Sequence, residues 1–64
     1  MNRIRPIRQA QQLSLKDLSA MTGIHYVNLS RYERGERGLE IEIAAVIAAA
    51  LNCTVDDLIE KETA

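Results

Sequence analysis

Few side chains in this sequence could carry out covalent chemistry or hold a metal ion. The chain has one histidine, His25, one cysteine, Cys53, and carboxylates scattered along its length. A single histidine and a single cysteine do not match the ligand spacing of a zinc site, and no nucleophile has a base at a recognisable spacing. We therefore expect no catalytic residue, no metal and no cofactor, and we interpret Cys53 as a small core residue rather than a redox sensor.

Arginine and lysine side chains, which can bind phosphates and base edges, are concentrated in one half of the chain. Residues 1–38 contain seven basic and three acidic side chains, a net charge of +4. Residues 39–64 contain one basic and six acidic side chains, a net charge of −5. A basic half is expected of a protein that approaches a polyanion such as DNA, although two solvated faces that differ by chance would give the same count.

The elements that would position these cations are all helical. The Ser14 and Asp17 pair predicts the start of one helix, Gly23 its end, Gly35 the end of the next, and Thr54 the start of the last. We expect one all-α domain over residues 1–64, with helices at 4–11, 15–22, 26–34, 40–51 and 55–60. The second and third helices, joined by a tight turn at Gly23, have the pattern of a helix-turn-helix.

Length and hydropathy exclude several other classes of protein. A chain of 64 residues offers room for one small core and little room for an enzymatic pocket. No apolar run approaches the roughly 20 residues that span a bilayer, and no charged leader with an apolar segment precedes the domain. We expect a cytoplasmic protein without a membrane partner or a small-molecule ligand.

Six short strings, in order along the chain, resemble the Cro/C1-type (XRE-like) helix-turn-helix family of phage repressors and small bacterial regulators. They are Ile4-Arg5-x-Ile7-Arg8, Leu13-Ser14-x-x-x-Leu18, Gly23-Ile24, Leu29-Ser30-Arg31-Tyr32-Glu33-Arg34-Gly35, Ile47-Ala48-x-x-Leu51 and Val55-x-x-Leu58-Ile59. The resemblance implies a compact five-helix, lambda-repressor-like domain that binds double-stranded DNA. It implies a sequence-specific transcriptional regulator, with a repressor as the leading expectation and a protein-interaction module of the antitoxin or anti-regulator type as the alternative.

In such a domain the third helix enters the major groove and its first turns meet base edges. Arg31 can bind guanine bidentately, Asn28 can read adenine or bind a phosphate, and Val27 can contact a thymine methyl. For Arg31, a phosphate contact or a plain surface arginine are the alternatives. We expect base contacts from Tyr26, Val27, Asn28 and Arg31, and phosphate contacts from Arg3, Arg5, Ser14, Lys16, His25, Ser30, Arg34 and Arg37.

The resemblance also implies an architectural ion pair and one lost contact. Arg8 and Glu33 are expected to pair between the first and third helices, so Arg8 is not assigned to DNA. Leu15 stands where the family often has a glutamine that contacts DNA, so anchoring there should depend on Ser14 or Lys16. Thr22 replaces a usual aliphatic residue, which indicates local repacking.

The predicted helix 40–51 is apolar on two sides. On a helical wheel one side carries Ile41, Ala44, Ala45, Ala48 and Leu51, and the other carries Ile43, Val46 and Ala50. A helix that is apolar on both sides needs cover on both, so we predict a homodimer interface formed by Leu39, Ile43, Val46, Ala50 and Ile59. The alternative is that the tail, residues 61–64, covers this side. A two-fold dimer would bind a palindromic operator.

Overall fold

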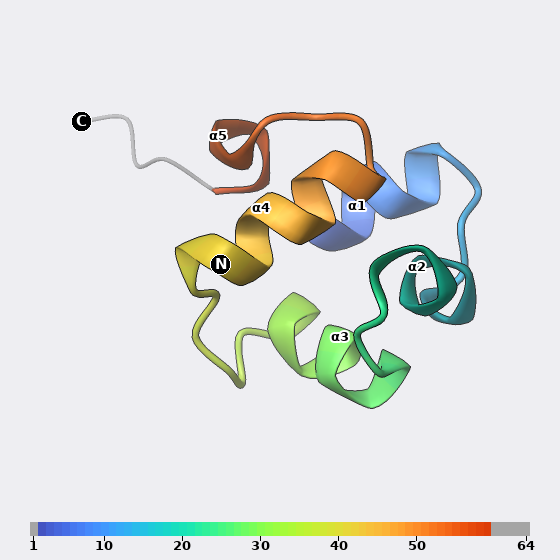
Figure 1. Cartoon of the computed structure of the whole chain (residues 1–64), viewed down its shortest axis with the longest axis horizontal. Coiled ribbons are helices and arrows are strands. Elements are labelled where there is room, and N and C mark those ends of the chain that lie inside the picture. Colours follow the sequence, from blue (N-terminus) through green and yellow to red (C-terminus); the bar gives the residue numbers. More distant parts are fainter. Residues whose placement is uncertain (1, 60–64) are drawn as a thin grey trace.

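The computed structural model describes residues 2–59, and within that range the chain forms five helices and no strand (Figure 1). Their order is α1 (Ile4–Ala10), α2 (Leu15–Thr22), α3 (Tyr26–Glu33), α4 (Ile41–Ala50) and α5 (Val55–Leu58). The predicted all-α class is confirmed. One isolated antiparallel bridge joins Asn2 to Ile59.

The predicted range 15–22 coincides with α2, and the other four ranges were too long. Gln11, Arg34 and Leu51 are C-caps, each closing the last turn with its own backbone N–H. Glu40 is an N-cap in an extended conformation, and Ile59 is extended after α5, while Glu60 lies outside the described residues. Each error is one or two residues, because capping residues are only half in the helix.

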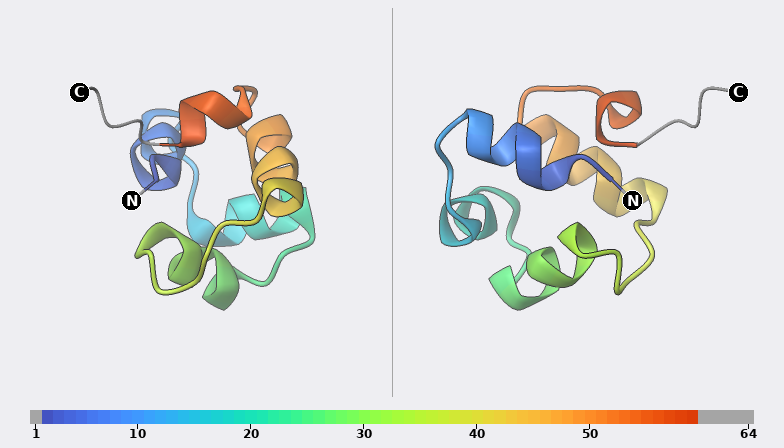
Figure 2. Two further views of the ribbon diagram at one scale, coloured as in Figure 1. Left: turned by 90° about the vertical axis from the view of Figure 1, so that its left-hand side faces the viewer. Right: turned by 180° about the vertical axis from the view of Figure 1, so that it is seen from behind.

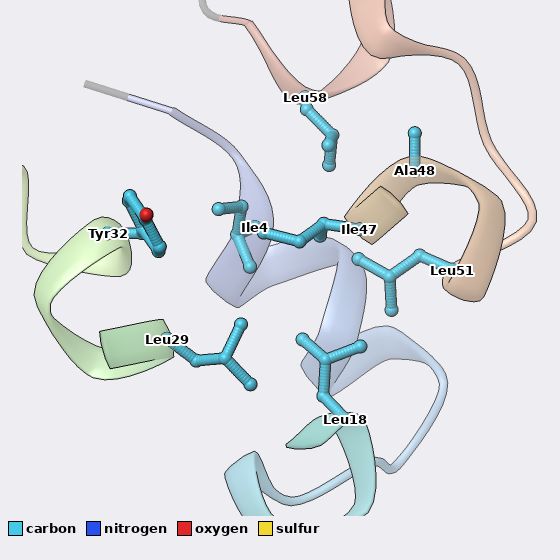
Figure 3. Close-up of a cluster of buried hydrophobic side chains, with 8 residues drawn as sticks. All are labelled: Ile4, Leu18, Leu29, Tyr32, Ile47, Ala48, Leu51 and Leu58. Atoms are coloured by element: carbon cyan, nitrogen blue, oxygen red, sulfur yellow. The ribbon is translucent and has the colours of Figure 1, made fainter. Parts of the chain in front are cut away.

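A single core joins all five helices (Figure 3). Each helix, or the residue that caps it, contributes at least one fully buried side chain; these are Ile4, Leu18, Leu29, Ile47, Leu51 and Leu58. Burying a side chain of this size contributes roughly 1.5–3 kcal/mol. The placement of α3 therefore depends on every other helix. In Figure 2, α2 and α3 lie on one side of this core, and α1 and α5 lie on the other.

Local hydrogen bonds set where α2 begins and ends. Ser14 Oγ accepts from the Asp17 N–H at 3.0 Å, and Asp17 Oδ2 accepts from the Ser14 N–H at 2.9 Å. The hydrogen bond from the Ser14 backbone N–H, and then that from the Ser14 side chain, hold the pKa of the Asp17 carboxyl below its usual value. Thr54 and Asp57 form the same box at the start of α5. Gly23 closes α2 with a φ of 77°, a conformation that side chains with a Cβ rarely adopt.

The wheel prediction for α4 was wrong at two positions. Ala44, Ala48 and Leu51 are buried as expected, but Ile41 is 75% exposed and Ala45 is exposed as well. The buried stripe consists of Ala44, Ile47, Ala48 and Leu51, and Ile41, the first residue of α4, lies outside it. None of the helices in residues 2–59 is long and apolar enough to cross a membrane.

Candidate nucleic-acid interface

Helix α3, the second helix of the helix-turn-helix motif, has one face in the core and the opposite face in solvent. Leu29 and Tyr32 are buried, with exposures of 0% and 5%. Val27 is 38% exposed and Arg31 is exposed, and the Arg31 side chain makes no hydrogen bond or ion pair among residues 2–59. Helical periodicity puts Val27 and Arg31 one turn apart on the same outward face. This face is open to solvent.

A buried ion-pair network, which we call the buried seam, holds α3 to α1. It consists of Arg5, Arg8 and Glu33, where Arg8 Nε lies 2.6 Å from Glu33 Oε2 and Arg8 Nη2 lies 3.1 Å from Glu33 Oε1. Arg8 Nη1 also donates to the Leu13 carbonyl at 2.7 Å. The Glu33 side chain is fully buried, and Arg5 Nε joins it at 3.3 Å from the exposed side. Arg8 is therefore held inside the fold by its hydrogen bonds to Glu33 and to the Leu13 carbonyl. Arg5 contacts Glu33 as well, but more than half of its side chain is exposed to solvent.

The start of α3 is organised by His25, Tyr26 and Lys16. His25 Nδ1 accepts from the Val27 N–H at 3.2 Å, so it serves as the N-cap of α3. Its ring stacks on Tyr26 with centroids 4.7 Å apart, and Lys16 Nζ lies 5.9 Å from the centre of the Tyr26 ring. An ammonium this close to the ring is attracted to its face. The first residues of α2 and α3 therefore converge at one site.

At the other end of α3 a second ion pair is exposed to solvent. Arg34 Nε lies 2.8 Å from Glu36 Oε2, and about half of each side chain is exposed. Arg34 Nε also donates to the Ser30 carbonyl at 3.3 Å. We call Arg34 and Glu36 the exposed pair. Arg37, two residues after Gly35, turns back toward α3, and its guanidinium lies 5.7 Å from the centre of the Tyr32 ring.

The remaining predicted contact residues lie on several different elements. Ser14 uses its hydroxyl oxygen as a cap, and its side chain also hydrogen-bonds the Asp17 carboxyl. Arg3 is exposed and lies close enough to Asp57 to lower the pKa of that carboxyl, after the larger effect of the hydrogen bonds from Thr54. Ser30 is half-buried. Leu15 packs against the core, in keeping with its apolar side chain.

Two residues that sequence reasoning did not assign position the motif. Asn2 Nδ2 donates to the Tyr32 carbonyl at 2.7 Å while its Oδ1 accepts from the Ile4 N–H at 3.2 Å. An asparagine just before a helix is a capping signal, but its bond to α3 spans 30 residues and has no local signal. Thr22 Oγ1 donates to the Leu18 carbonyl and accepts from the Ile24 N–H, which braces the turn of the motif.

Cys53 lies among core side chains and belongs to no cluster of potential metal ligands in residues 2–59. No group of three potential metal ligands occurs among residues 2–59. Cys53 is half-buried and packs against the core. Burial, and to a smaller extent the charge of Asp57, raise the pKa of its thiol. A raised thiol pKa leaves less thiolate, the reactive form, at neutral pH.

Comparisons with known proteins agree with this geometry. Residues 4–58 match the helix-turn-helix family. Control protein C.SmaI of Serratia marcescens is 29% identical over 59 residues, which make up 92% of this chain and 70% of that protein. The matched segment contains all five helices and both halves of the motif. The chain therefore belongs to the Cro/C1-type helix-turn-helix family, whose members are DNA-binding transcriptional regulators.

Proposed function

We propose that this protein is a sequence-specific repressor that inserts α3 into the major groove of a palindromic operator as a homodimer. One observation carries the proposal. The outward face of α3 presents Val27 and an unpaired Arg31, while Leu29 and Glu33 fix the opposite face to the core and to α1. A rigidly held helix with a free guanidinium on its outer face is suited to reading a groove.

The proposed roles follow from the chemistry of each side chain. Arg31 donates two parallel hydrogen bonds to guanine O6 and N7, and Val27 contacts a thymine methyl. Tyr26, 41% exposed beside Lys16, completes the surface that faces bases. Phosphate contacts come from residues around this face and fix the register without reading sequence; they are Arg3, Arg5, Ser14, Lys16, His25, Ser30, Arg34 and Arg37.

The charge distribution supports this orientation. Glu33 and Glu36 are both engaged by arginines, and Asp17 is engaged by the backbone of its own capping box. Lys16 and Arg31 have no carboxylate partner among residues 2–59. Two of the positive charges of the basic half are therefore carried near the start and on the outer face of α3, where a phosphate backbone would attract them.

We propose a homodimer formed through Leu39, Ile43, Val46, Ala50 and Ile59. Val46 and Ile59 are each 43% exposed, which is high for aliphatic side chains, and Leu39 and Ile59 line the same surface pocket. Ile43 and Ala50 pack partly against the core, so they would form the inner edge of the interface. Two-fold pairing would set two α3 helices one DNA turn apart, about 34 Å, on a palindrome.

Selection of bound sequences from a random duplex pool tests DNA recognition directly. We expect the wild type to enrich a palindrome and Arg31→Ala to lose preference at one base pair of each half-site. Arg34→Ala is the matched control and should weaken binding to all sequences alike. Failure to enrich any sequence, together with a flat response of duplex binding to salt, would favour the protein-interaction module instead.

The dimer is tested by adding a charge to α4. Val46→Glu should lower the sedimentation mass to that of a monomer and weaken operator binding. Ala45→Glu places the same charge on an exposed residue outside the proposed interface and should leave both quantities unchanged. An unchanged mass for Val46→Glu would contradict the interface.

Repression is proposed because a domain that occupies DNA needs no further contact to block transcription. Transcription in vitro from a promoter that overlaps the selected operator should fall as the protein is added. The Arg31→Ala variant should leave transcription unchanged at the same concentrations. A rise in transcription with the wild type would identify an activator.

A further inference from the structure

Lys16, in the first turn of α2, and Tyr26, at the start of α3, contact each other across the helix-turn-helix. Lys16 Nζ lies 5.9 Å from the centre of the Tyr26 ring, and both side chains are exposed. The ammonium makes no ion pair and no hydrogen bond among residues 2–59. A cation at this distance is attracted to the face of the ring. The contact therefore favours those conformations of the Lys16 side chain that lie beside the start of α3.

The Tyr26 ring is itself oriented by His25. The two rings are stacked, with centroids 4.7 Å apart and planes inclined by 23°. Aromatic rings at this separation attract each other. His25 is oriented in turn, because its Nδ1 accepts from the Val27 N–H at 3.2 Å and so caps α3. The support for Lys16 thus runs from the backbone of α3 through His25 to Tyr26.

The contact with the ring leaves Lys16 able to bind an anion. An ammonium has three N–H donors, and a ring face attracts its charge without accepting all three. The neighbouring carboxylate, Asp17, accepts instead from the Ser14 N–H at 2.9 Å. In a helix-turn-helix the first helix of the motif, here α2, crosses the DNA backbone, and a lysine is a compact charge suited to a phosphate.

We propose that Tyr26 is a positioning residue for Lys16, whose ammonium it holds between the starts of α2 and α3 for contact with a backbone phosphate. The inference rests on the proposed function, and it assigns Tyr26 a role apart from contact with a base. A flexible side chain loses conformational freedom when it binds, and one already held near its bound position loses less. The ring therefore strengthens binding to every sequence, because a phosphate contact carries no base information.

Duplex affinities measured by fluorescence anisotropy test this role. Tyr26→Leu removes the ring, and Tyr26→Phe, the matched control, keeps it. We expect Tyr26→Leu to weaken binding about two- to fivefold, the factor that corresponds to a cation and a ring at an exposed site. The loss should be the same for a selected operator and for an unrelated duplex. Tyr26→Phe should bind as tightly as the wild type.

A double variant distinguishes positioning from direct contact with DNA. When Lys16→Met has removed the ammonium, adding Tyr26→Leu should cause no further loss, because no cation remains to be positioned. Lys16→Met alone should reduce the slope of log affinity against log salt by about 0.9, the value for one phosphate contact.

Three results of these measurements would overturn the inference. An equal loss from Tyr26→Leu with and without Lys16 would show that the ring contacts DNA itself. A loss in Tyr26→Phe as large as that in Tyr26→Leu would assign the effect to the hydroxyl group. An unchanged salt slope in Lys16→Met would show that Lys16 binds no phosphate.

A second experiment needs no DNA and separates this inference from the proposed function. The ring current of Tyr26 shifts the proton signals of a group that lies over its face. In the free protein, the Cε proton signals of Lys16 should therefore move in Tyr26→Leu and stay near their wild-type positions in Tyr26→Phe. Unmoved signals in Tyr26→Leu would contradict the contact itself, whatever the protein binds. If the signals move but no duplex is bound, the proposed function is wrong and the phosphate role is lost with it, while the contact stands.

Discussion

The two Arg–Glu pairs that flank the end of α3 have similar distances and different surroundings. In the buried seam, Arg8 Nε and Glu33 Oε2 are 2.6 Å apart, and the two side chains are 9% and 0% exposed. In the exposed pair, Arg34 Nε and Glu36 Oε2 are 2.8 Å apart, and the side chains are 52% and 53% exposed. Distance therefore does not separate them, and burial does. A buried charge left without its partner is costly, whereas an exposed one is solvated by water.

The two pairs therefore have different roles. The buried seam holds α3 in place, and the exposed pair affects the charge at the end of α3. The buried seam connects α1, the Leu13 carbonyl and α3, so its loss would move the recognition helix. The exposed pair contacts only the last turn of α3 and the loop that follows. We expect changes in the first to act on folding and changes in the second to act on the affinity for DNA.

The largest effect is expected for Arg8→Ala. It leaves Glu33 buried with only the half-exposed Arg5 beside it, and breaking a buried pair in this way costs about 3–5 kcal/mol. A chain of this length has a total stability of only about 3–10 kcal/mol, so the variant should be partly or wholly unfolded at 25 °C. Circular dichroism with urea titration measures the loss.

A double variant checks that the penalty comes from the unpaired charge. Arg8→Met combined with Glu33→Leu replaces the pair by apolar side chains, and such replacements are often neutral or stabilising. The double variant should be more stable than Arg8→Ala. If it is equally unstable, the bond from Arg8 to the Leu13 carbonyl matters more than the ion pair, and the comparison with the exposed pair would be weakened.

Ser14→Ala should lower the free energy of unfolding by a smaller amount, about 1 kcal/mol, although Ser14 is exposed. This residue satisfies a backbone N–H of α2, which an exposed ion pair does not do. The variant sharpens the comparison, because it shows whether exposure alone makes a polar contact weak. Urea titration of Ser14→Ala beside Arg34→Ala gives the answer, and equal losses in the two would contradict the distinction.

The same cap predicts a dependence of stability on pH. Asp17 has a lowered pKa in the folded protein, so its carboxylate stabilises the fold above the ordinary aspartate pKa of the unfolded chain. This contribution is lost as the pH falls from that value through the lowered folded pKa. Thermal unfolding between about pH 5 and pH 2 should show a smaller acid-induced decrease in Asp17→Asn than in the wild type. An unchanged decrease would assign the acid sensitivity to other carboxylates, such as Asp57.

Within the buried seam itself, Arg5→Ala should lower the free energy of unfolding by less than about 1 kcal/mol, which is the usual contribution of an exposed ion pair. The Arg5 side chain is 55% exposed, and Arg8 still neutralises Glu33 after its removal. Urea titration next to Arg8→Ala measures the ratio between two arginines that share one carboxylate. If Arg5→Ala lowers the free energy of unfolding as much as Arg8→Ala does, the burial of Glu33 alone, and not the burial of its arginine partner, determines the size of the loss.

The parts of this structure that sequence could predict are those with local causes. The bounds of α2 followed from Ser14, Asp17 and Gly23, because a capping box and a left-handed glycine act within a few residues. The side of α4 that faces the core could not be fixed by the wheel alone, which is why Ile41 was misplaced.

Contacts between distant residues needed more than periodicity. The pairing of Arg8 with Glu33 was expected from the family resemblance and not from spacing. The bond from Asn2 to Tyr32 and the contact of Arg37 with Asn28 depend on how the loops return to α3. The base and phosphate contacts stay predictions, because they depend on a partner.

The smallest effect on folding is expected for Glu36→Gln, which should change the free energy of unfolding by no more than about 0.5 kcal/mol. Its effect on DNA binding should be larger. Removing Glu36 deletes a negative charge from the basic half and releases Arg34, so affinity for any duplex at low salt should rise about two- to fivefold. Fluorescence anisotropy at several salt concentrations measures this rise, and Glu40→Gln, which removes a charge from an exposed residue in the acidic half, is the matched control. If both variants gain equally, net charge alone explains the effect, and the exposed pair has no specific influence on Arg34.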